Sequence, residues 1–326
     1  MSAFDFSAYT ETVINATGPN AHPRVKEIFP ILIRKMHEFC IEADVTVDEW
    51  MAACNLLIGA GKVSSEARNE MVLVSDVFGI ESLVDTLDQT RARRHVKDAT
   101  ANAEDSATFS AILGPFYRTG VPVQENGTTI IRQEEAGAQY THLFGKVCGE
   151  DGKPLVNAIV DIWHDAPDGL YDSQSPEKPE YHCRGRFLTD SEGRYDTVCL
   201  KPTPYPIPFD HQAGQLLKLM DRHPMRPAHI HFWVEAKGHK TLVTQVFDSL
   251  SDYLSDDSVF AVKDKLVVEF LPISKTYKAP AGLENKMVYE LEQNFILPTA
   301  QNKGEYIVGA PLTGMTSEVH GANTKA

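Results

Sequence analysis

Two histidines in the segment 229–231, H-I-H, stand two positions apart among strand-forming residues. Side chains two apart on a β-strand point to the same face, so His229 and His231 are expected to present their imidazoles side by side. Neutral imidazole is a common ligand of first-row metals, and this spacing suits a single ion. The pattern also fits two histidines on the solvated face of an antiparallel sheet, so the pair alone leaves both interpretations open.

Two tyrosines occur in contexts that fix their position. Tyr171 follows D-G-L shortly after an expected strand, and Tyr205 lies between two prolines in P-Y-P-I-P. Proline fixes φ and removes an amide donor, so the segment around Tyr205 cannot be a central strand and holds its phenol rigidly. A single tyrosine is more often a packed aromatic than a metal ligand, and these two become candidates because they accompany the histidine pair.

Other metal-binding patterns are absent from the sequence, which contains no H-E-x-x-H, C-x-x-C or EF-hand motif. A 2-His-1-carboxylate iron(II) site or a zinc site, combining the two histidines with Asp165 or Asp248, is an alternative for the same residues. A non-enzymatic β-sandwich module for metal binding or protein interaction is a third. Three further histidines are expected at a pocket edge or on the surface: His164, His182 and His223.

Three segments taken together resemble one known family: W-H-D-A-P-D-G-L-Y-D at 163–172, Y-P-I-P at 205–208 and R-H-P-M-R-P-A-H-I-H at 222–231. They are similar to the intradiol ring-cleaving dioxygenases, and the resemblance extends over about residues 25–275. It implies one non-haem iron(III) ion, Fe(3+), with four protein ligands: Tyr171, Tyr205, His229 and His231. Two phenolates donate strongly to a trivalent ion, which explains why such a set would favour iron(III) over iron(II).

The resemblance also implies the reaction. A bound catechol would lose both hydroxyl protons, and dioxygen would then open the ring between the two hydroxyls to give a muconate-type diacid. Tyr205 would take up one proton, Arg226 would stabilise carbanion character on the ring, and Gln245 would contact the developing oxygen intermediate. Arg226 has an equally common alternative role, as a surface ion-pair partner beside a strand end.

Within the family, Y-P-I-P, R-H-P-M-R-P-A-H and V-F-x-V-K-D (259–264 here) are typical of enzymes that act on hydroxyquinol, benzene-1,2,4-triol. Cleavage would give 3-hydroxy-cis,cis-muconate, which is maleylacetate. Gln245 disagrees, because many hydroxyquinol members carry histidine there, so catechol cleavage to cis,cis-muconate is the alternative. Pyrogallol and alkylcatechols also stay open, because one hydroxyl or methyl group changes binding by only about 1–3 kcal/mol unless a polar partner is built for it.

The substrate is expected to lie on an apolar floor with a few polar groups. Besides Arg226, the residues implied to line it are Leu83, Ile112, Leu113, Gly114, Pro115, Phe116, Ile207, Pro208 and Val259. Asp85 and Asp88, on the same helix as Leu83, are the candidates to receive a third hydroxyl, although acids on helices are mostly solvated.

These residues must be positioned by two different kinds of structure. Apolar residues at three- and four-residue spacing predict a helix starting near Pro23, and T-x-x-E at 46–49 predicts a capping box that starts a second. G-A-G at 59–61 is expected to break that helix before a third helical stretch over 71–87, ended by the polar run 91–105. Short segments rich in Val, Ile, Phe and Tyr follow, with strands expected at 142–148, 158–164, 229–234, 242–247 and 266–270.

The predicted fold class is therefore α+β, with an N-terminal helical dimerisation domain and linker at 1–105 and an antiparallel β-sandwich catalytic domain at 106–326. The dimerising role comes from the resemblance, which implies a homodimer through the N-terminal helices, with a lipid between them in many members. We expect the polar end, 313–326, to fray or pack loosely.

Composition excludes several classes of partner. A formal net charge of -14, from 45 acidic and 31 basic residues, disfavours nucleic acid and anionic membranes. Five scattered cysteines suggest neither a disulfide framework nor a thiolate zinc site. Residues 1–17 lack a signal-peptide pattern and no run reaches the roughly 18 apolar residues of a membrane span, so a cytoplasmic protein is expected. The expected partners are a small catecholic substrate, dioxygen and a second copy of the chain.

Overall fold

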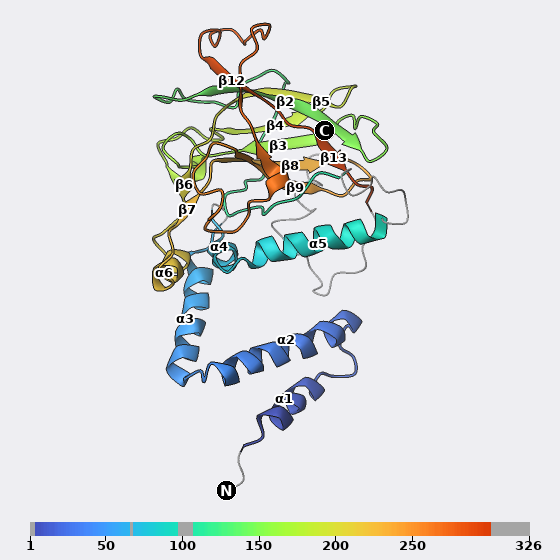
Figure 1. Ribbon diagram of the computed structural model, residues 1–326, viewed down its shortest axis with the longest axis vertical. Coiled ribbons are helices and arrows are strands. Elements are labelled where there is room, and N and C mark those ends of the chain that lie inside the picture. The colour runs from blue at the N-terminus through green and yellow to red at the C-terminus, as the bar shows by residue number, and fades with distance from the viewer. Residues whose placement is uncertain (1–3, 66–67, 97–106, 301–326) are drawn as a thin grey trace. The chain divides into compact units, whose positions relative to one another are not determined.

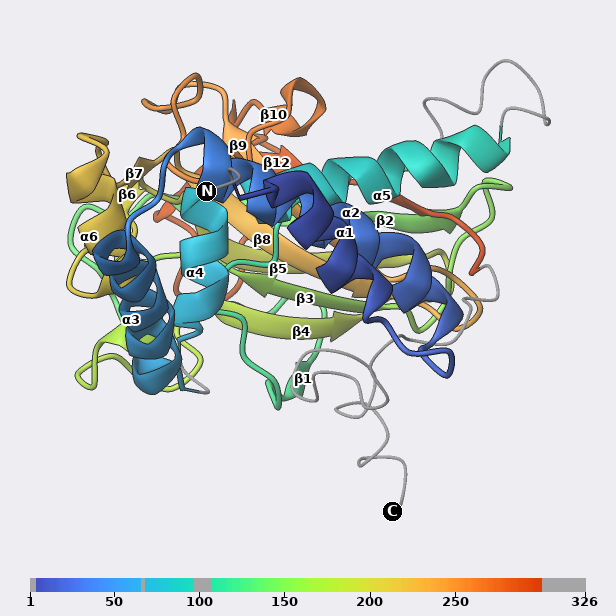
Figure 2. The ribbon, with the colours of Figure 1, turned by 90° about the horizontal axis from the view of Figure 1, so that it is seen from below.

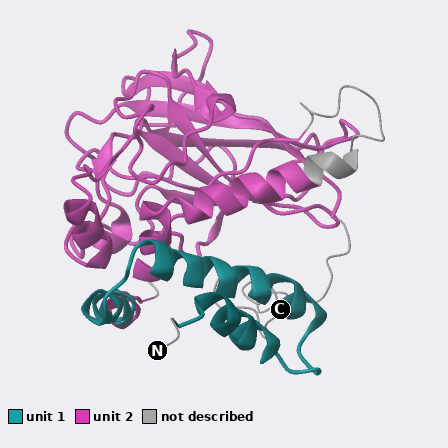
Figure 3. Ribbon diagram, turned by 60° about the horizontal axis from the view of Figure 1, so that its bottom comes forward, with its two compact units in different colours: residues 1–58, 302–326 teal, residues 59–301 magenta. Residues whose placement is uncertain are grey.

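The computed structural model describes residues 4–65, 68–96 and 107–300. The chain divides into two compact units, residues 1–58 with 302–326 and residues 59–301 (Figure 3). Of the first unit the structure describes residues 4–58. The domain boundary predicted at residue 105 and the expected frayed end at 313–326 both lie outside the described residues.

The first unit is helical, as predicted. It contains α1 (Phe6–Asn15), α2 (Pro23–Glu42) and the first part of α3 (Val47–Val63). Proline at the first position of α2 gives the predicted start. The capping box before α3 is present, because the Thr46 amide donates to Glu49 Oε2 at 2.8 Å and the Glu49 amide donates to Thr46 Oγ1 at 3.3 Å. The sequence reasoning did not foresee α1, which begins after an Asp5 side-chain cap.

In the second unit the helices differ from the prediction at three points. Helix α3 continues through 59–61, so the expected glycine breaker is wrong. Glycine costs a helix only about 1 kcal/mol, and Gly59 leaves room for Gln212, whose Nε2 would lie 2.4 Å from an added Cβ. The third stretch is two helices, α4 (Glu70–Val77) and α5 (Ile80–Val96), separated at Gly79, where φ is +69°. A further helix, α6 (Gln212–Leu219), was not predicted.

Two β-sheets form the rest of this unit (Figures 1 and 2). The six-stranded sheet has the order β1 (Val123–Gln124), β4 (Arg184–Leu188), β3 (Ile159–Trp163), β8 (His229–Glu235), β9 (Leu242–Asp248) and β10 (Val267–Val268). The other has the order β11 (Leu271–Pro272), β12 (Met287–Glu292), β2 (Tyr140–Gly149) and β13 (Phe295–Leu297), with β5 (Arg194–Leu200) also paired to β2. The described residues also contain the short elements η2 (Asp172–Gln174) and η3 (Asp264–Leu266) and a two-stranded sheet of β6 (Tyr205–Pro206) and β7 (Met225–Arg226).

The central pairings are antiparallel, as predicted: β3 with β4 and β8, β8 with β9, and β2 with β5. The pairings of β1 with β4, of β10 with β9, and of β12 and β13 with β2 are parallel, which the prediction of an antiparallel sandwich did not include. The strand expected at 266–270 is only two residues long, and β5 was not predicted. Helices followed by a two-sheet β unit confirm the α+β class.

Alternation along β8 separates the core from the site. Ile230, Phe232 and Val234 belong to the apolar cluster between the two sheets, together with side chains of β2, β3, β5 and β13. His229 and His231 therefore lie on the other face of their sheet. The same strand thus contributes to both the stability of the sandwich and the chemistry on its outer face.

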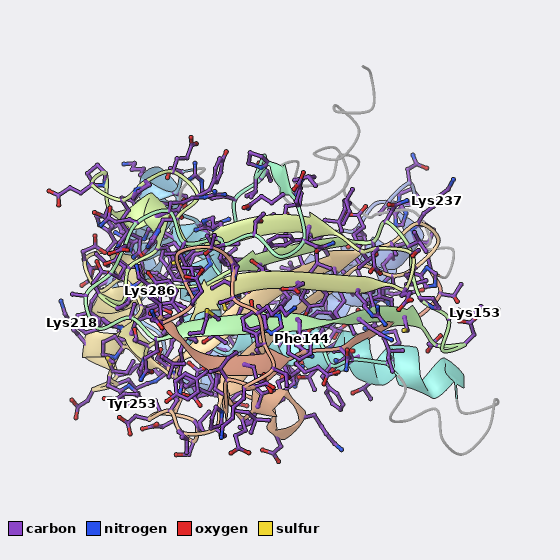
Figure 4. All side chains as sticks on the ribbon, turned by 90° about the horizontal axis from the view of Figure 1, so that it is seen from above. Phe144, Lys153, Lys218, Lys237, Tyr253 and Lys286 are labelled. Atoms are coloured by element: carbon purple, nitrogen blue, oxygen red, sulfur yellow. The ribbon has the colours of Figure 1, made fainter. Side chains whose placement is uncertain are left out.

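Basic residues are dispersed over this unit. Lys153 and Lys237 lie at one end of the β-sandwich and Lys218 and Lys286 at the other (Figure 4). Within the described ranges, no helix combines the length and the apolar character needed to cross a bilayer.

Candidate active site

Four side-chain donor atoms converge on the outer face of the six-stranded sheet. Tyr171 Oη lies 3.2 Å from Tyr205 Oη, which lies 3.4 Å from His229 Nε2. His229 Nε2 is in turn 3.1 Å from His231 Nε2. All four side chains are buried, none with more than 2% of its surface exposed. The structure thus brings together the residues that the sequence predicted as ligands.

The histidines are oriented by their strand neighbours. His231 pairs across the sheet with Trp163 on β3, and the two rings stack at 4.7 Å and 10°. His229 Nδ1 donates to the Pro227 carbonyl at 2.7 Å, so its Nε2 carries the lone pair that faces the centre. The Pro227 carbonyl in the segment R-P-A therefore selects the tautomer of His229.

The tyrosines are placed by local backbone constraints. Tyr205 pairs with Arg226 in the short β6–β7 ladder, consistent with the prediction that this proline-flanked segment is no central strand. Tyr171 follows a turn at Gly169, where φ is +76° and an added Cβ would lie 3.1 Å from Tyr205 Cβ. Glycine is needed there both for its conformation and for the close approach of the two tyrosine segments.

Arg226 and Gln245 lie directly beside this cluster. The Arg226 guanidinium donates to Gln245 Oε1 at 2.8 Å and to His229 Nε2 at 3.0 Å. Gln245 Nε2 donates to the Ile112 carbonyl at 2.7 Å, which fixes the orientation of its amide. Arg226 is 2% exposed, so the alternative of a surface ion pair is wrong for this residue.

A buried acid that the sequence reasoning missed completes this arrangement. Asp257 accepts from Arg226 Nε at 3.1 Å and from Arg226 Nη2 at 3.3 Å. Its carboxylate also accepts from the amides of Val259 at 3.3 Å and Ala261 at 3.0 Å. Asp257 stands two residues before the V-F-x-V-K-D segment, and the unpaired basic charge of Arg226 was the only signal that could have pointed to it.

The predicted substrate loop, residues 112–116, lies against the ligands. Gly114 has φ +75°, and an added Cβ would lie 3.2 Å from His231 Cε1. The Phe116 ring stacks on Tyr171 at 4.7 Å, and Leu113 packs against the same aromatic cluster. These contacts bring the loop to the candidate ligands, while its role in binding a substrate stays a prediction.

The other predicted lining residues divide into two groups. Ile207 and Val259 are buried, and the Ile207 amide donates to the Pro224 carbonyl beside the β6–β7 pair that contains Arg226. Pro208 follows Ile207 and is partly exposed. Leu83 is 59% exposed on α5, and its role as a lining residue stays a prediction. The residue of α5 that reaches the loop is Glu81, whose carboxylate accepts from the Leu113 amide at 2.9 Å.

Several acids and histidines lie where they were not expected. Asp85 and Asp88, proposed for a third hydroxyl, pair instead with Lys263 and Lys240. His164 and His182 are buried rather than at a pocket edge or on the surface, at 0% and 1% exposure, whereas His223 is exposed.

Burial has the largest effect on the pKa values of the four candidate ligands. Burial raises the pKa of Tyr171 well above its ordinary value, and the neighbouring Tyr205 adds to this; burial also raises the pKa of Tyr205, opposed by Arg226. Burial, followed by nearby positive charge, lowers the pKa of His229 and His231 well below the ordinary value. The protein alone therefore favours two phenols and two neutral imidazoles.

The donor set fits a trivalent metal ion. Ligand atoms bound at about 2.0–2.1 Å around one ion lie roughly 3 Å apart, as these do. Burial disfavours a charged imidazolium, so both rings are neutral, and each can turn a lone pair towards a cation placed among the four donors. Across the described residues, no three His, Cys, Asp or Glu side chains gather as a metal site, so the 2-His-1-carboxylate alternative lacks its carboxylate.

Comparison with known proteins agrees with this geometry. A family model described as "Dioxygenase" matches residues 112–296, and one described as "Catechol dioxygenase N terminus" matches residues 22–95. The chain belongs to the intradiol dioxygenase family. Members of this family use non-haem iron, act on catechol-type substrates with dioxygen and are typically dimers.

The relatives include enzymes for both candidate substrates. A catechol 1,2-dioxygenase of Candida albicans is 39% identical over 90% of this chain and 92% of its own length. A hydroxyquinol 1,2-dioxygenase of a Rhizobium species is 35% identical over 88% of this chain and 93% of its own. The crystal structure of hydroxyquinol 1,2-dioxygenase from Pseudomonas putida is similar at a TM-score of 0.74 and 29% identity, covering 90% of this chain and 99% of that one. These relatives are named for different diols, so the substrate preference of this intradiol dioxygenase depends on its own residues.

Proposed function

We propose that this intradiol dioxygenase binds one iron(III) ion through Tyr171, Tyr205, His229 and His231 and cleaves hydroxyquinol between its adjacent hydroxyls. The observation that carries the metal assignment is the convergence of the four donor atoms at 3.1–3.4 Å. When bound, the ion supplies the Lewis acidity that favours loss of both hydroxyl protons from a catecholic ring and so makes that ring electron-rich.

The protein residues have separate tasks around the ring. Tyr205 Oη lies between the other donors, so it is the phenol placed to hold a proton taken from a substrate hydroxyl. The buried guanidinium of Arg226 stabilises negative charge that develops on the ring carbons. Gln245, oriented by Arg226 and Ile112, presents a fixed amide to the oxygen atoms that enter. Burial of all these groups excludes water that would compete for the same charges.

Hydroxyquinol is supported by the segments 205–208, 222–229 and 259–264. They contribute Tyr205, Arg226 and Val259, which are linked through β6–β7 pairing and the Asp257 carboxylate. Two buried acids, Asp257 and Asp76, act electrostatically on Arg226, so this wall is more polar than a plain catechol ring needs. Catechol is the alternative, supported by Gln245 and by the 39% identical relative named for it.

A homodimer through the N-terminal helices is also part of the proposal. Helix α2 has no buried residue, and its exposed side chains include Ile31, Leu32, Met36 and Phe39. A face of this kind is unusual for a monomer surface and fits a second copy of the same helix, and its apolar character also suits an acyl chain. The cytoplasmic location stays a prediction.

The test is oxygen uptake by iron-loaded protein with hydroxyquinol and catechol side by side, together with a Tyr205→Phe variant. We expect a coloured protein, from charge transfer between phenolate and iron(III), and faster uptake with hydroxyquinol. Tyr205→Phe should shift the charge-transfer band and lower uptake by about 10²-fold or more, as loss of a catalytic proton acceptor does. Tyr195→Phe is the matched control, because Tyr195 is equally buried but its hydroxyl donates to the Gln293 carbonyl.

Each outcome discriminates between the candidate functions. Faster uptake with catechol would replace hydroxyquinol by the alternative substrate. A colourless protein that takes up iron but consumes no oxygen with either diol would refute the dioxygenase assignment and favour a binding module. Equal effects of the two Tyr→Phe variants would show that Tyr205 has no special role.

A further inference from the structure

Two carboxyl groups meet in the interior of the second unit outside the ligand set. Asp76, at the end of α4, is 1% exposed, and its carboxyl group interacts electrostatically with that of Glu81 on α5. Among the described residues neither oxygen of Asp76 has a nitrogen or hydroxyl donor, and Glu81 Oε2 also lacks one. Since a carboxylate only accepts hydrogen bonds, this contact is attractive only when one of the two groups carries a proton.

Glu81 connects this pair to the loop at the candidate site. Its other oxygen, Oε1, accepts from the Leu113 amide at 2.9 Å. The next residue, Gly114, lies against His231, and Phe116 two residues later stacks on Tyr171. The Leu113 amide is thus the backbone anchor beside the part of the loop that contacts two candidate ligands.

We propose that Asp76 and Glu81 share one proton and that this pair positions the loop 112–116 against the site. Neither residue touches the reacting atoms, so both are positioning residues. The inference rests on the proposed function only in so far as the loop borders the diol. The shared proton and the hydrogen bond from the Leu113 amide to Glu81 depend only on contacts within this chain.

The charges around the pair determine its response to pH. Asp76 faces Glu81 from α5, Arg226 from β7 and Asp257 from the loop after β9. Burial, followed by contact with Glu81, raises the pKa of Asp76 well above its ordinary value, while Arg226 partly opposes this. Near Glu81 the basic side chain Lys263 is already paired with Asp85 and also donates to the Ser110 carbonyl.

The pair therefore changes state in a defined direction. With one proton, Asp76 donates to Glu81, and Glu81 can also accept from Leu113. As pH rises through the raised pKa of Asp76, a second negative charge appears in a buried site. Repulsion then separates the two groups, and the Leu113 amide loses its acceptor. The loop contact is present at lower pH and lost at alkaline pH.

The experiment uses the full iron-loaded protein and three variants: Glu81→Ala, Glu81→Gln and Asp76→Asn. Catechol binding is measured without oxygen from the change in charge-transfer absorption, and KM and kcat are measured with oxygen present. Glu81→Ala should weaken catechol binding and raise KM about tenfold with a smaller change in kcat, as loss of a hydrogen bond to a charged group does. Glu81→Gln should restore most of the affinity, because an amide oxygen also accepts from Leu113.

The Asp76→Asn variant tests whether Asp76 and Glu81 share a proton. An asparagine amide donates to Glu81 at every pH, so the alkaline fall in catechol affinity, relative to the value at pH 7 for the same variant, should move to higher pH or disappear. The control is Glu150→Ala, which removes an exposed carboxylate from a turn. Affinity in Glu81→Ala equal to that in Glu150→Ala would overturn the positioning role. An alkaline fall in Asp76→Asn identical to that of the unmodified protein would overturn the shared proton.

A separate measurement distinguishes this failure from failure of the proposed function. Thermal unfolding as a function of pH requires no substrate. The melting temperature of the unmodified protein should fall more steeply with rising pH than that of Asp76→Asn, because the unmodified protein loses the additional buried proton of Asp76. Superimposable profiles would refute the shared proton even if both diols are cleaved, and absent oxygen uptake with divergent profiles would refute only the enzymatic assignment.

Discussion

Removing the charge of Asp257 should destabilise the second unit and lower turnover at the same time. The Arg226 and Asp257 side chains are each 2% exposed, and the carboxylate accepts four contacts of 3.0–3.3 Å, two of them from the guanidinium. Removing one partner of such a buried pair costs about 3–5 kcal/mol, because the remaining charge is left uncompensated. For a unit of this size that corresponds to a fall in Tm of roughly 6–20 °C.

A double-mutant cycle separates the ion pair from general damage. Asp257→Asn and Arg226→Gln each leave one buried partner alone, whereas the double variant removes both charges. The double variant should therefore be more stable than the sum of the single effects predicts, by about 2 kcal/mol. Denaturant unfolding of the three variants and the unmodified protein measures this coupling. Asp151→Asn, which breaks an exposed pair with Lys153, is the control and should leave unfolding unchanged.

The same substitution has a catalytic consequence. Without the Asp257 carboxylate, the guanidinium keeps its contact to Gln245 but loses the charged partner on its other side, so Arg226 is no longer held at one angle to the ring. Misplacement of this size lowers kcat by about 10- to 100-fold. Iron content and the resting charge-transfer band should be retained, because the four ligands are untouched. A coupling energy below about 0.5 kcal/mol, or unchanged kcat, would show that Arg226 is oriented by other groups.

Three further outcomes are expected. Gly114→Ala should lower iron content and oxygen uptake, because at φ +75° the new Cβ meets His231 at 3.2 Å; unchanged iron content by atomic absorption would contradict this. Burial raises the pKa of Asp165 to about 7, above its value in the unfolded chain. The contribution of Asp165 to the free energy of unfolding of the iron-free protein is therefore complete at low pH. It falls by about 1.4 kcal/mol per pH unit as pH rises to 7. Denaturant unfolding between pH 5 and 8 should show this slope, and Asp165→Asn should remove it. Phe39→Lys should convert a dimer to monomers in sedimentation, because Phe39 is 64% exposed on α2, and a dimer of unchanged stability would place the interface elsewhere.

The four candidate ligands were predicted as a set from the resemblance of three segments to one family, and local signals explain how their side chains are presented. A two-residue period fixes the relative direction of His229 and His231 on any strand, and the prolines around Tyr205 limit its backbone wherever it lies. The strands and the capping box were predictable for the same reason, because alternation of apolar and polar side chains and short-range hydrogen bonds depend on residues that are close in the sequence. Glycine was misleading at 59–61, because tertiary packing against Gln212 outweighs its weak preference against helix.

Residues that support the ligands could not be predicted, because their partners are distant along the chain. Leu83 was expected at the site and Glu81 was not, although both lie on α5. Residues two positions apart on a helix lie about 200° apart, and the sequence alone does not show that Glu81 is the one that faces the loop. Asp76 and Asp257 became visible only when the fold placed them beside Glu81 and Arg226.

Several buried polar atoms in the described residues lack a hydrogen-bond partner, and some of them belong to residues at the candidate site. The core between the two sheets is apolar apart from Tyr195, whose hydroxyl donates to Gln293. Within the described part of the chain, by contrast, buried polar atoms without a hydrogen-bond partner include His231 Nδ1, Trp163 Nε1 and both oxygens of Asp76. Each such atom costs about 1–3 kcal/mol, which a sandwich selected for stability alone would avoid by apolar substitution. An ion that binds the folded chain but not the unfolded one adds to its stability, so the thermal stability of the iron-loaded protein should exceed that of the iron-free protein.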